Sequence, residues 1–403
     1  MQPRRMVQSG AVNQISELIS HLQAQGAGPR HVAHLLRLWV QALPQGPRRR
    51  QPEHFLPLRV RAGLPEWQAT LDGLATLHQR HPAQDGSERL LVKLADGQTV
   101  ESVLLTPERI PGLCVSTQVG CAVGCGFCMT GQGGLLRQLG SAEIVAQLAL
   151  ARTLRPVKKV VFMGMGEPAH NLDAVLEAIE LMGTLGNIGH KNLVFSTVGD
   201  ARAFERLMAL REGQVRPALA LSLHTTKAAL RETLLPRAAR ITPAELVAAG
   251  QAYAQATAYP IQYQWTLLEG VNDGDDEIEG IVRLLHGQYA LLNLIPYNTV
   301  PGMAWKRPSW ERAAEMARLL HRRGVLTKLR HSAGQDVDGG CGQLRARSED
   351  GELRSSPRAP VRGAQRIPIV PASVSVPVPV HGHGPAPVHA TAVTPQPELK
   401  PTR

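Results

Sequence analysis

Short apolar runs alternate with helical segments through the middle of this 403-residue chain, and this alternation limits its fold more than any other feature. Strands are predicted where apolar and β-branched residues cluster, at Val160 to Met163, Asn192 to Ser196, Ala218 to Ser222, Ile261 to Trp265 and Leu291 to Ile295. Helices are predicted at Ser141 to Thr153, Leu172 to Met182 and Glu311 to Arg323. With Cys114 on an early strand and Val325 to Leu329 on a late one, we expect an α/β fold with about six or seven parallel strands.

Polar residues follow several of these predicted strands directly. They are Gly164 to Pro168, Ser196 and Thr197, Ser222 to His224, and Pro296 to Asn298. In a parallel (β/α) barrel the residues past the strand ends converge on one mouth, where such enzymes have their active sites. We therefore favour a full or partial parallel (β/α) barrel over a doubly wound sheet, although the pattern alone is compatible with both.

Three of the five cysteines, Cys121, Cys125 and Cys128, lie in one glycine-rich segment. A structural zinc site prefers four protein ligands, commonly in two halves, and this chain has no second half. The bacterial ferredoxin pattern needs a fourth cysteine soon after the third, which is also missing. Three thiolates can hold a 4Fe-4S cluster and leave its fourth iron open to another ligand. The spacing therefore favours a 4Fe-4S cluster over zinc.

The segment from Gly164 to Pro168 contains two glycines and Glu167 between a predicted strand and a predicted helix. It lacks the third glycine of the dinucleotide-binding fingerprint, and by itself it would be only a connecting turn. Behind a cluster-binding loop it has a second interpretation. The Glu167 carboxylate and the bare glycine backbone could receive the amino group of S-adenosylmethionine (SAM).

The charge and the cysteine usage indicate where the chain works and what it binds. The net charge of +11 favours a polyanionic partner, with nucleic acid as the first candidate, although a solvated basic face is the commoner meaning of any one charged run. An odd number of cysteines with no secretory segment ahead of them indicates the reducing cytoplasm. No apolar run approaches the length of a membrane span, so we expect no membrane association.

Three domains are predicted along the chain. Residues 11 to 43 have helical apolar spacing, which indicates a small helical module within an N-terminal domain of residues 1–95 that could bind RNA. The catalytic core is expected at 96–347. From 348 to 403 the chain is rich in proline, which is typical of a disordered tail.

Several motifs resemble the radical SAM superfamily, and more closely its RlmN/Cfr group of adenine RNA methyltransferases. The similarity covers residues 100 to 344 and rests on the segments Leu113 to Cys121, Met163 to Pro168, Ser222 to His224, Gly270 to Asp273, Asn293 to Asn298 and Asp336 to Leu344. It implies a 4Fe-4S cluster held by Cys121, Cys125 and Cys128, and SAM contacts at Gly166, Glu167, Ser196, Ser222, Leu223, His224 and Asn298.

The resemblance also implies catalytic roles for Cys341, Cys114 and Glu101. A first SAM would methylate Cys341, and a second, cleaved at the cluster to a 5'-deoxyadenosyl radical, would activate that methyl group for addition to adenine. Glu101 would remove the ring proton, and Cys114 would then attack Cys341 and release the product, leaving a disulfide. From the residues alone, Glu101 would be a solvated strand glutamate, and both cysteines would be small buried side chains.

The implied substrate is ribosomal RNA, and in some members transfer RNA, modified at carbon 2 of adenine more often than at carbon 8. The implied partners are this RNA, an electron donor and a thiol reductant, and we expect a monomer. Two other functions stay open, a radical SAM enzyme with a non-RNA substrate and a non-catalytic RNA-binding protein with a structural cluster. Met129 and the pair Gly339-Gly340 depart from the family pattern, and the two glycines are expected to loosen the loop that carries Cys341.

Overall fold

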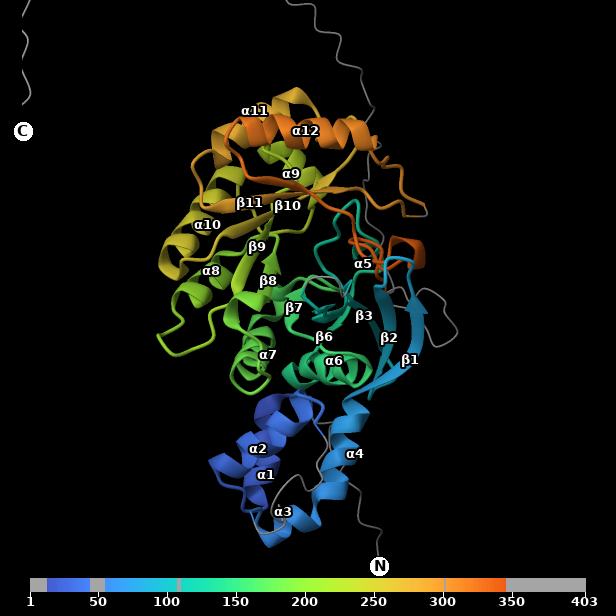
Figure 1. Cartoon of the computed structure of the whole chain (residues 1–403), viewed down its shortest axis with the longest axis vertical. Helices are drawn as coiled ribbons and strands as arrows, with labels where there is room; N and C mark the ends of the chain where they lie inside the picture. The colour runs from blue at the N-terminus through green and yellow to red at the C-terminus, as the bar shows by residue number, and fades with distance from the viewer. Residues whose placement is uncertain (1–12, 44–54, 107–109, 301, 346–403) are drawn as a thin grey trace, which may run out of the picture. The chain divides into compact units, whose positions relative to one another are not determined.

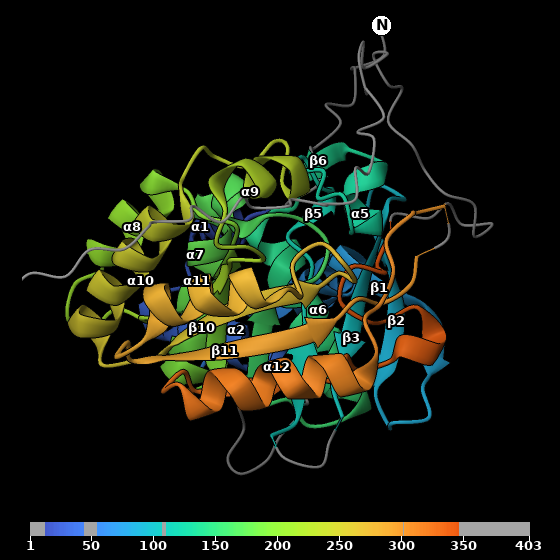
Figure 2. The ribbon, with the colours of Figure 1, turned by 90° about the horizontal axis from the view of Figure 1, so that it is seen from above.

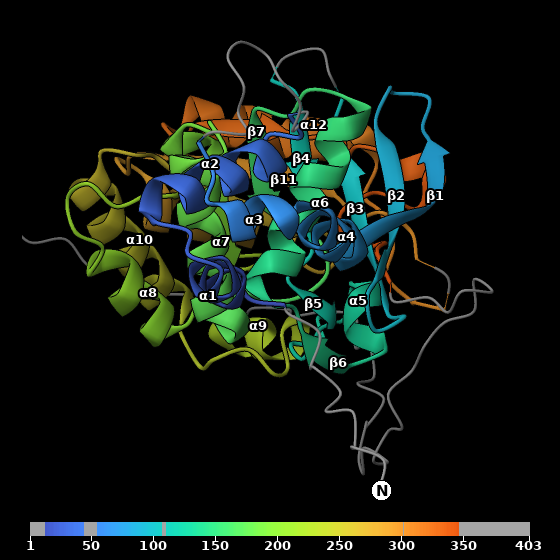
Figure 3. The same cartoon turned by 90° about the horizontal axis from the view of Figure 1, so that it is seen from below.

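A computed structural model describes residues 13–43, 55–106, 110–300 and 302–345 of the chain. Its N-terminal part begins with four helices that lie beside α6 and α7 (Figures 1 and 3). Leu36 and Trp39 of α2 and Leu71 of α4 belong to the same buried core as the rest of the fold. The predicted helical N-terminal module is therefore present. These helices are α1 (Ile15–Ala24), α2 (Pro29–Val40), α3 (Leu58–Ala62) and α4 (Leu64–Leu74).

Seven neighbouring strands of a ten-stranded sheet, from β4 to β12, are parallel. This agrees with the prediction of about six or seven parallel strands. Three antiparallel strands extend this sheet on the β4 side. The strand order is β1-β2-β3-β4-β7-β8-β9-β10-β11-β12, and β5 pairs separately with β6. The antiparallel strands are β1 (Ala75–Pro82), β2 (Glu88–Leu94) and β3 (Thr99–Leu104). The parallel strands are β4 (Gly112–Cys114), β7 (Lys159–Phe162), β8 (Leu193–Thr197), β9 (Ala218–Ser222), β10 (Ile261–Leu267), β11 (Ala290–Pro296) and β12 (Thr327–Leu329), and the separate pair is β5 (Gln118–Gly120) and β6 (Leu135–Gln138).

Helices connect the parallel strands and cover the outer face of the sheet, as seen from above in Figure 2. The helix α12 packs on β11 and β12, and α10 packs on β9 and β10. The helices are α5 (Met129–Gln132), α6 (Ser141–Leu154), α7 (Leu172–Thr184), α8 (Ala201–Met208), α9 (Ala228–Leu234), α10 (Pro243–Thr257), α11 (Asp275–Leu285) and α12 (Trp310–Arg322). Short 3-10 turns are η2 (Pro168–Asn171), η3 (His190–Asn192) and η4 (Gln335–Val337).

The parallel strands form a partial barrel. Within the described residues β12 pairs with β11 alone, and β4 pairs with β3 and β7, so the sheet has two ends at β1 and β12. Of the two predicted forms, full and partial, the structure therefore has the partial one. Both edges of β4 are already paired, with β3 and β7, so β12 cannot pair with β4 and the barrel stays open.

The strand β10 shows how side chains divide between the two faces of the sheet. Buried and partly exposed residues alternate strictly along β10. Tyr263 and Trp265 are buried, whereas Gln264 and Thr266, which each follow one of them, are partly exposed. The hydroxyl of Tyr263 reaches the carbonyl of Val247 on α10, which places the apolar set under the helices. The polar set therefore faces the inside of the barrel.

The predicted domain limits stay predictions. The limit at residues 95 and 96 falls between β2 and β3, which pair with each other. The predicted tail at 348–403 lies outside the described residues. In the described part of the chain, no helix has the length and apolar character that crossing a membrane requires.

Candidate active site

The ends of the parallel strands surround a cavity of about 160 Å³. Cys121, Cys125 and Cys128 line it from the loop after β5, and Cys341 lines it from the segment after η4. The strand ends contribute Gly166, Glu167, Ser196, Ser222 and His224. Nine residues predicted from the sequence therefore meet in one place. Leu223, Asn298, Cys114 and Glu101 do not line this cavity.

The cysteine loop takes its shape from close backbone contacts. Gly120 has φ of +81°, and a side chain there would come within 2.0 Å of the carbonyl oxygen of Gly134. The Cys121 amide donates to that same carbonyl at 2.9 Å. On the other side, Trp305 donates its indole N–H to the carbonyl of Gly126 at 2.7 Å. The loop thus needs glycine at position 120, and hydrogen bonds hold the loop from both sides.

An apolar shell encloses the three thiols. Its buried members are Val123, Phe127, Met129, Val198, Leu234, Leu235, Leu268, Tyr297 and Val300. Met129, which departs from the family pattern, is 9% exposed and is part of this shell. Such a shell keeps water from thiolate ligands and so protects a cluster that they hold.

The electrostatics of the three thiols fit a shared metal cluster. Burial, together with repulsion from Cys128, raises the pKa of Cys121 to about 12 and that of Cys125 well above its ordinary value. Neighbouring buried thiolates are stable only when positive charge compensates them, as the irons of a cluster do. No group of three or more His, Cys, Asp and Glu side chains in the described ranges could hold a metal ion by itself. Three thiols that have no fourth protein ligand beside them in the described part of the chain suit a 4Fe-4S cluster with one open iron better than a four-coordinate zinc ion.

Glu167 is enclosed by the fold and is 5% exposed. Its Oε1 accepts the Ala169 amide at 3.0 Å and its Oε2 accepts the Val198 amide at 3.0 Å. Burial raises the pKa of Glu167, while hydrogen bonds from Thr197, Ala169 and Val198 act against that rise. These three hydrogen bonds use three of the roughly four lone-pair sites of the carboxylate, so one site can still accept from an ammonium group in the cavity.

Gly166 provides the close approach that the sequence suggested. Its φ is +104°, and a Cβ atom there would lie 2.6 Å from the side chain of Gln118. The amide of Glu167 donates to the Gln118 side chain at 2.8 Å, which fixes the turn against β5. Only glycine fits between these groups.

His224 is a neutral hydrogen-bond donor towards the cavity. The amide of Thr266 donates to its Nδ1 at 3.0 Å, so the ring proton is on Nε2. Burial, and then the charge of Arg231, lower the pKa of His224 to about 3. Leu223, by contrast, is fully buried in the core, and its amide donates to the carbonyl of Gln264 at 3.0 Å. The Leu223 carbonyl also accepts the Thr225 amide at 2.9 Å, so both main-chain polar groups of Leu223 are engaged within the protein.

Sequence reasoning missed Arg231, which is 3% exposed and holds three strand-end carbonyls together. Its guanidinium donates to the carbonyls of Ser222 at 2.7 Å and Leu223 at 2.8 Å, and to that of Val198. Nothing in the local sequence distinguishes this arginine from a surface one. Gln264 and Thr266, which also line the cavity, had a signal in the strict polar alternation of β10.

Asn298 holds the segment that carries Cys341. Its Nδ2 donates to the carbonyl of Cys341 at 2.9 Å and to the hydroxyl of Ser332 at 2.9 Å. Its Oδ1 is buried and has no partner in the structure, which leaves an acceptor for a bound molecule. A Cβ atom at Gly340 would lie 2.8 Å from the Asn298 amide nitrogen. The expectation that this glycine loosens the loop is therefore wrong, because it lets the loop pack tightly on Asn298.

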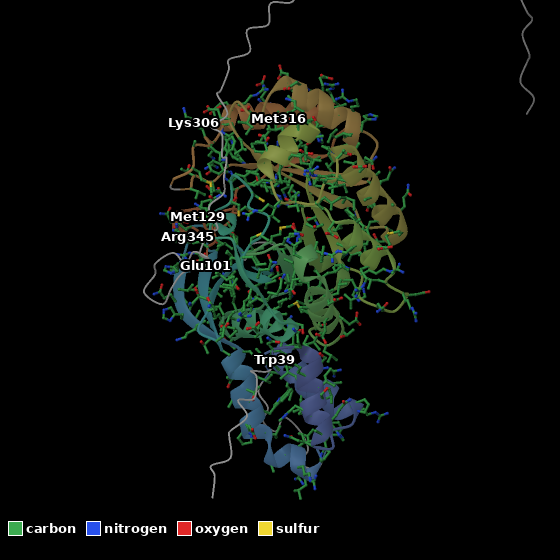
Figure 4. All side chains as sticks on the ribbon, turned by 180° about the vertical axis from the view of Figure 1, so that it is seen from behind. Trp39, Glu101, Met129, Lys306, Met316 and Arg345 are labelled. Carbon is green, nitrogen blue, oxygen red and sulfur yellow. The ribbon has the colours of Figure 1, made fainter. Side chains whose placement is uncertain are left out.

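Cys114 lies on β4, and burial followed by the charge of Cys341 raises its pKa. The two cysteines, 227 positions apart in sequence, are therefore close enough to interact. Glu101 on β3 is fully buried and forms an ion pair with Arg89. Its Oε2 accepts the amide of Arg345 at 2.9 Å, and Figure 4 shows Glu101 and Arg345 near each other. The sequence-based picture of a solvated glutamate does not hold for Glu101.

Comparisons with known proteins agree with this site. The family model described as the radical SAM superfamily matches residues 115–285, which include the three cavity cysteines. A crystal structure of a radical SAM methyltransferase from Sphaerobacter thermophilus is 32% identical, with a TM-score of 0.71, and the match covers 82% of this chain and 97% of that one. The chain belongs to the radical SAM methyltransferases. Its cofactors are accordingly a 4Fe-4S cluster and SAM.

Curated relatives of this radical SAM methyltransferase are more similar still. A relative from Methylibium petroleiphilum is 71% identical over 84% of this chain and 94% of its own length. A relative from Pseudomonas aeruginosa is 63% identical over 86% of this chain and 99% of its own length. Both carry the name "Probable RNA methyltransferase".

Proposed function

We propose that this radical SAM methyltransferase methylates a ring carbon of adenine in RNA. Carbon 2 is the favoured position and carbon 8 the alternative, in ribosomal RNA or, as a second substrate class, transfer RNA. The observation that carries the proposal is that Cys341 lines the same cavity as the three cluster cysteines and Glu167. The names of the relatives support RNA as the substrate.

The cysteine pair has the roles that this chemistry needs. An adenine ring carbon is poor in electrons and does not attack the methyl group of SAM, so a radical route is required. The cluster, when bound by Cys121, Cys125 and Cys128, supplies the electron that cleaves SAM to a 5'-deoxyadenosyl radical. The sulfur of Cys341 carries the methyl carbon to the base. The sulfur of Cys114 then attacks that of Cys341, so that the carbon–sulfur bond breaks and a disulfide forms, which an external thiol reductant reopens.

SAM is held by polar groups around the cavity in this proposal. The Glu167 carboxylate accepts from the amino group of SAM, the His224 Nε2–H donates to an acceptor oxygen of SAM, and Ser196 and Ser222 line the same cavity. Asn298 lies behind this lining, and its unpartnered Oδ1 is proposed to accept a further hydrogen bond from SAM. Gly166 lets the ligand approach the backbone, and Leu223 is proposed to contribute by fixing the backbone between Ser222 and His224 through its own main-chain hydrogen bonds. These residues lie at the ends of β8 and β9 or directly after β7, β9 and β11.

Glu101 is proposed to remove the proton from the ring carbon. In the structure both of its carboxylate oxygens are engaged, by Arg89 and by the Arg345 amide. A role as base therefore requires Glu101 to exchange one of these partners for the substrate. Such an exchange on substrate binding is common for catalytic groups.

The remaining parts of the proposal concern the surroundings of the reaction. The net charge of +11 suits a partner with many phosphates. Residues 1–95 are proposed to contribute to RNA binding. We further propose that the protein acts as a monomer in the cytoplasm, with an electron donor and a thiol reductant from the cell.

Anaerobic reconstitution with analysis of the products tests this function. The wild-type protein should hold about four irons and four sulfides per chain, form 5'-deoxyadenosine and transfer labelled methyl groups from SAM to unmodified ribosomal RNA. Cys128→Ala should lose iron and all SAM cleavage, while Cys341→Ala should keep the iron and lose RNA methylation. SAM cleavage without any labelled RNA would favour a non-RNA substrate. Binding of RNA without 5'-deoxyadenosine would favour a non-catalytic protein.

A further inference from the structure

Two exposed aromatic rings stack on each other beyond the end of β12. The indole of Trp310, the first residue of α12, lies on the imidazole of His331, with 4.3 Å between the ring centroids and 21° between the ring planes. Trp310 keeps 41% of its surface exposed, and His331 is exposed as well. The Trp310–His331 pair therefore presents a flat aromatic surface to solvent.

The Trp310–His331 pair lies close to the segment that carries Cys341. Ser332, which follows His331, is buried, and its hydroxyl accepts the Nδ2 of Asn298 at 2.9 Å. The same Nδ2 donates to the carbonyl of Cys341 at 2.9 Å. Cys341 lines the cavity and is itself exposed, so a substrate can reach it from this side. One peptide bond and two hydrogen bonds thus connect the stacked rings to the methyl-carrying cysteine.

The segment that leads to the stacked pair, residues 305–310, is fixed at two points. The indole of Trp305 donates to the carbonyl of Gly126 in the cysteine loop at 2.7 Å. The guanidinium of Arg307 donates to the side chain of Gln335 in η4 at 3.2 Å. These two bonds hold the segment between the cysteine loop and η4. The stacked pair therefore has a fixed place beside the active-site cavity.

The surroundings of the pair carry positive charge. Lys306 and Arg307 are exposed, and residues 302–310 contain no acidic residue. The next acidic residue along the chain is Glu311. In Figure 4 Lys306 lies on the same side of the molecule as Met129, which belongs to the shell around the three cluster cysteines. Positive charge attracts phosphates and flat rings attract bases, and proteins bind single-stranded RNA with this combination.

We propose that the Trp310–His331 pair stacks an unpaired base of the RNA substrate next to the adenine that is methylated. This proposal rests on the proposed RNA methyltransferase function and extends it by a substrate-binding site. An enzyme that modifies a base must take it out of the stack of its neighbours. A neighbouring base then loses a stacking partner, and an aromatic side chain can replace that partner. The stacked pair supplies this surface beside Cys341.

The test compares the affinities of the reconstituted wild type and its variants for in vitro transcribed, unmodified ribosomal RNA. Trp310→Leu keeps an apolar side chain but removes the ring, and it should weaken binding about tenfold, the loss expected for one stacked base. Trp310→Phe keeps an aromatic ring and should stay within about threefold of the wild type. The slope of log Kd against log salt should be unchanged in both variants, because stacking releases no counterions.

Tyr289→Leu is the matched control for the loss of an exposed aromatic ring. Tyr289 is 61% exposed, but it lies directly before β11, at the opposite end of the parallel strands from the cavity. Tyr289→Leu should bind RNA as the wild type does. Iron content and the affinity for SAM should stay at wild-type values in all three variants. Bound RNA should also quench the tryptophan fluorescence of the wild type more than that of Trp310→Phe, because a base stacked on an indole quenches its emission.

Two results would overturn the proposal. Wild-type affinity of Trp310→Leu for RNA would show that this ring stacks no base. A loss of iron or of SAM affinity in Trp310→Leu would assign the ring to the stability of the fold around the cavity. Failure of the underlying function looks different, because then the wild-type protein itself neither binds nor methylates ribosomal RNA, and the stacking site falls with it.

Discussion

Glu167 is the residue whose charge matters most for the proposed SAM site. Replacing Glu167 with glutamine keeps the size of the side chain but removes its negative charge. One of the two oxygens that accept the Ala169 and Val198 amides also becomes an NH2 group, which can only donate. We expect Glu167→Gln to weaken SAM binding at least about tenfold, because a hydrogen bond to a charged group contributes roughly 1.5–3 kcal/mol. Equilibrium dialysis with labelled SAM measures this, with the exposed Glu212→Gln as control. Equal affinities of the two variants would rule out the role of Glu167.

His224 makes stability depend on pH in a defined direction. Its ring stays neutral in the folded state, since the pKa falls from 6.5 to about 3, whereas the unfolded ring takes up a proton below about pH 6.5. The unfolded state then binds more protons, so the free energy of unfolding must decrease as the pH falls. His224→Asn, chosen because asparagine tolerates the φ of +61°, should remove this contribution.

The size of the His224 effect follows from linkage. Between pH 7 and pH 5 the wild type should lose about 2 kcal/mol of stability more than His224→Asn does. Denaturant unfolding of the anaerobic proteins at several pH values measures the difference. Stability curves that run parallel over this range would contradict a neutral His224.

At the scale of elements, Arg89 ties the segment after η4 to the β2–β3 hairpin. It pairs with Glu101 on β3, and its Nε donates to the carbonyl of Val337 at 2.6 Å. Arg89→Met leaves a buried carboxylate without its partner and should cost about 3–5 kcal/mol of stability. The double variant Arg89→Met/Glu101→Leu should recover a large part of that loss. Denaturant unfolding checks both values, and a double variant no more stable than Arg89→Met would contradict the buried ion pair as the cause.

The packing of Gly340 on Asn298 gives a second prediction for the same segment. In Gly340→Ala the new Cβ would lie 2.6 Å from the Gln343 side chain and 2.8 Å from that of Asn298. We expect a loss of about 1–3 kcal/mol and faster alkylation of Cys341, because the segment must shift. Gly73→Ala in α4 has open space around it and should be neutral or up to about 1 kcal/mol stabilising. Wild-type stability of Gly340→Ala would show that the segment is loose.

At the scale of the whole molecule, the N-terminal helices share one core with the barrel. The amide of Ile15 donates to the Ser141 hydroxyl at 2.8 Å, and Arg152 donates to the carbonyl of Val40 at 2.8 Å, so α1 and α2 are bonded to α6. A chain that begins at residue 75 should lose more than about 10 °C in Tm, because it exposes apolar surface of α6. A chain that ends at Pro357 keeps the compact unit 1–357 and should match the wild type. A stable, cluster-binding chain from residue 75 onward would favour the predicted independent N-terminal domain.

The partition between sequence and structure is clear from particular residues. The strand at Ala218 to Ser222 was predicted with its observed limits, because an apolar run bounded by breakers has few other conformations. The burial of Glu101 was not predicted, because its sequence neighbours do not show that Arg89 and the Arg345 amide enclose its side chain. Arg231 was missed for the same reason, since its partners are backbone carbonyls that no side-chain pattern reveals.

The sequence by itself determined much of the local structure, the α/β class with its parallel strands, and eight of the residues that meet at the cavity, Cys121, Cys125, Cys128, Gly166, Glu167, Ser196, Ser222 and His224. These follow from periodicity, from the rule that parallel strand ends share one edge, and from the spacing of three cysteines. The tertiary structure alone decided which distant segments touch. It brought Cys114 close to Cys341, closed Gly340 onto Asn298, and enclosed Glu101 between Arg89 and the Arg345 amide. Such contacts depend on the register between strands and on the packing of distant segments, which no local sequence contains.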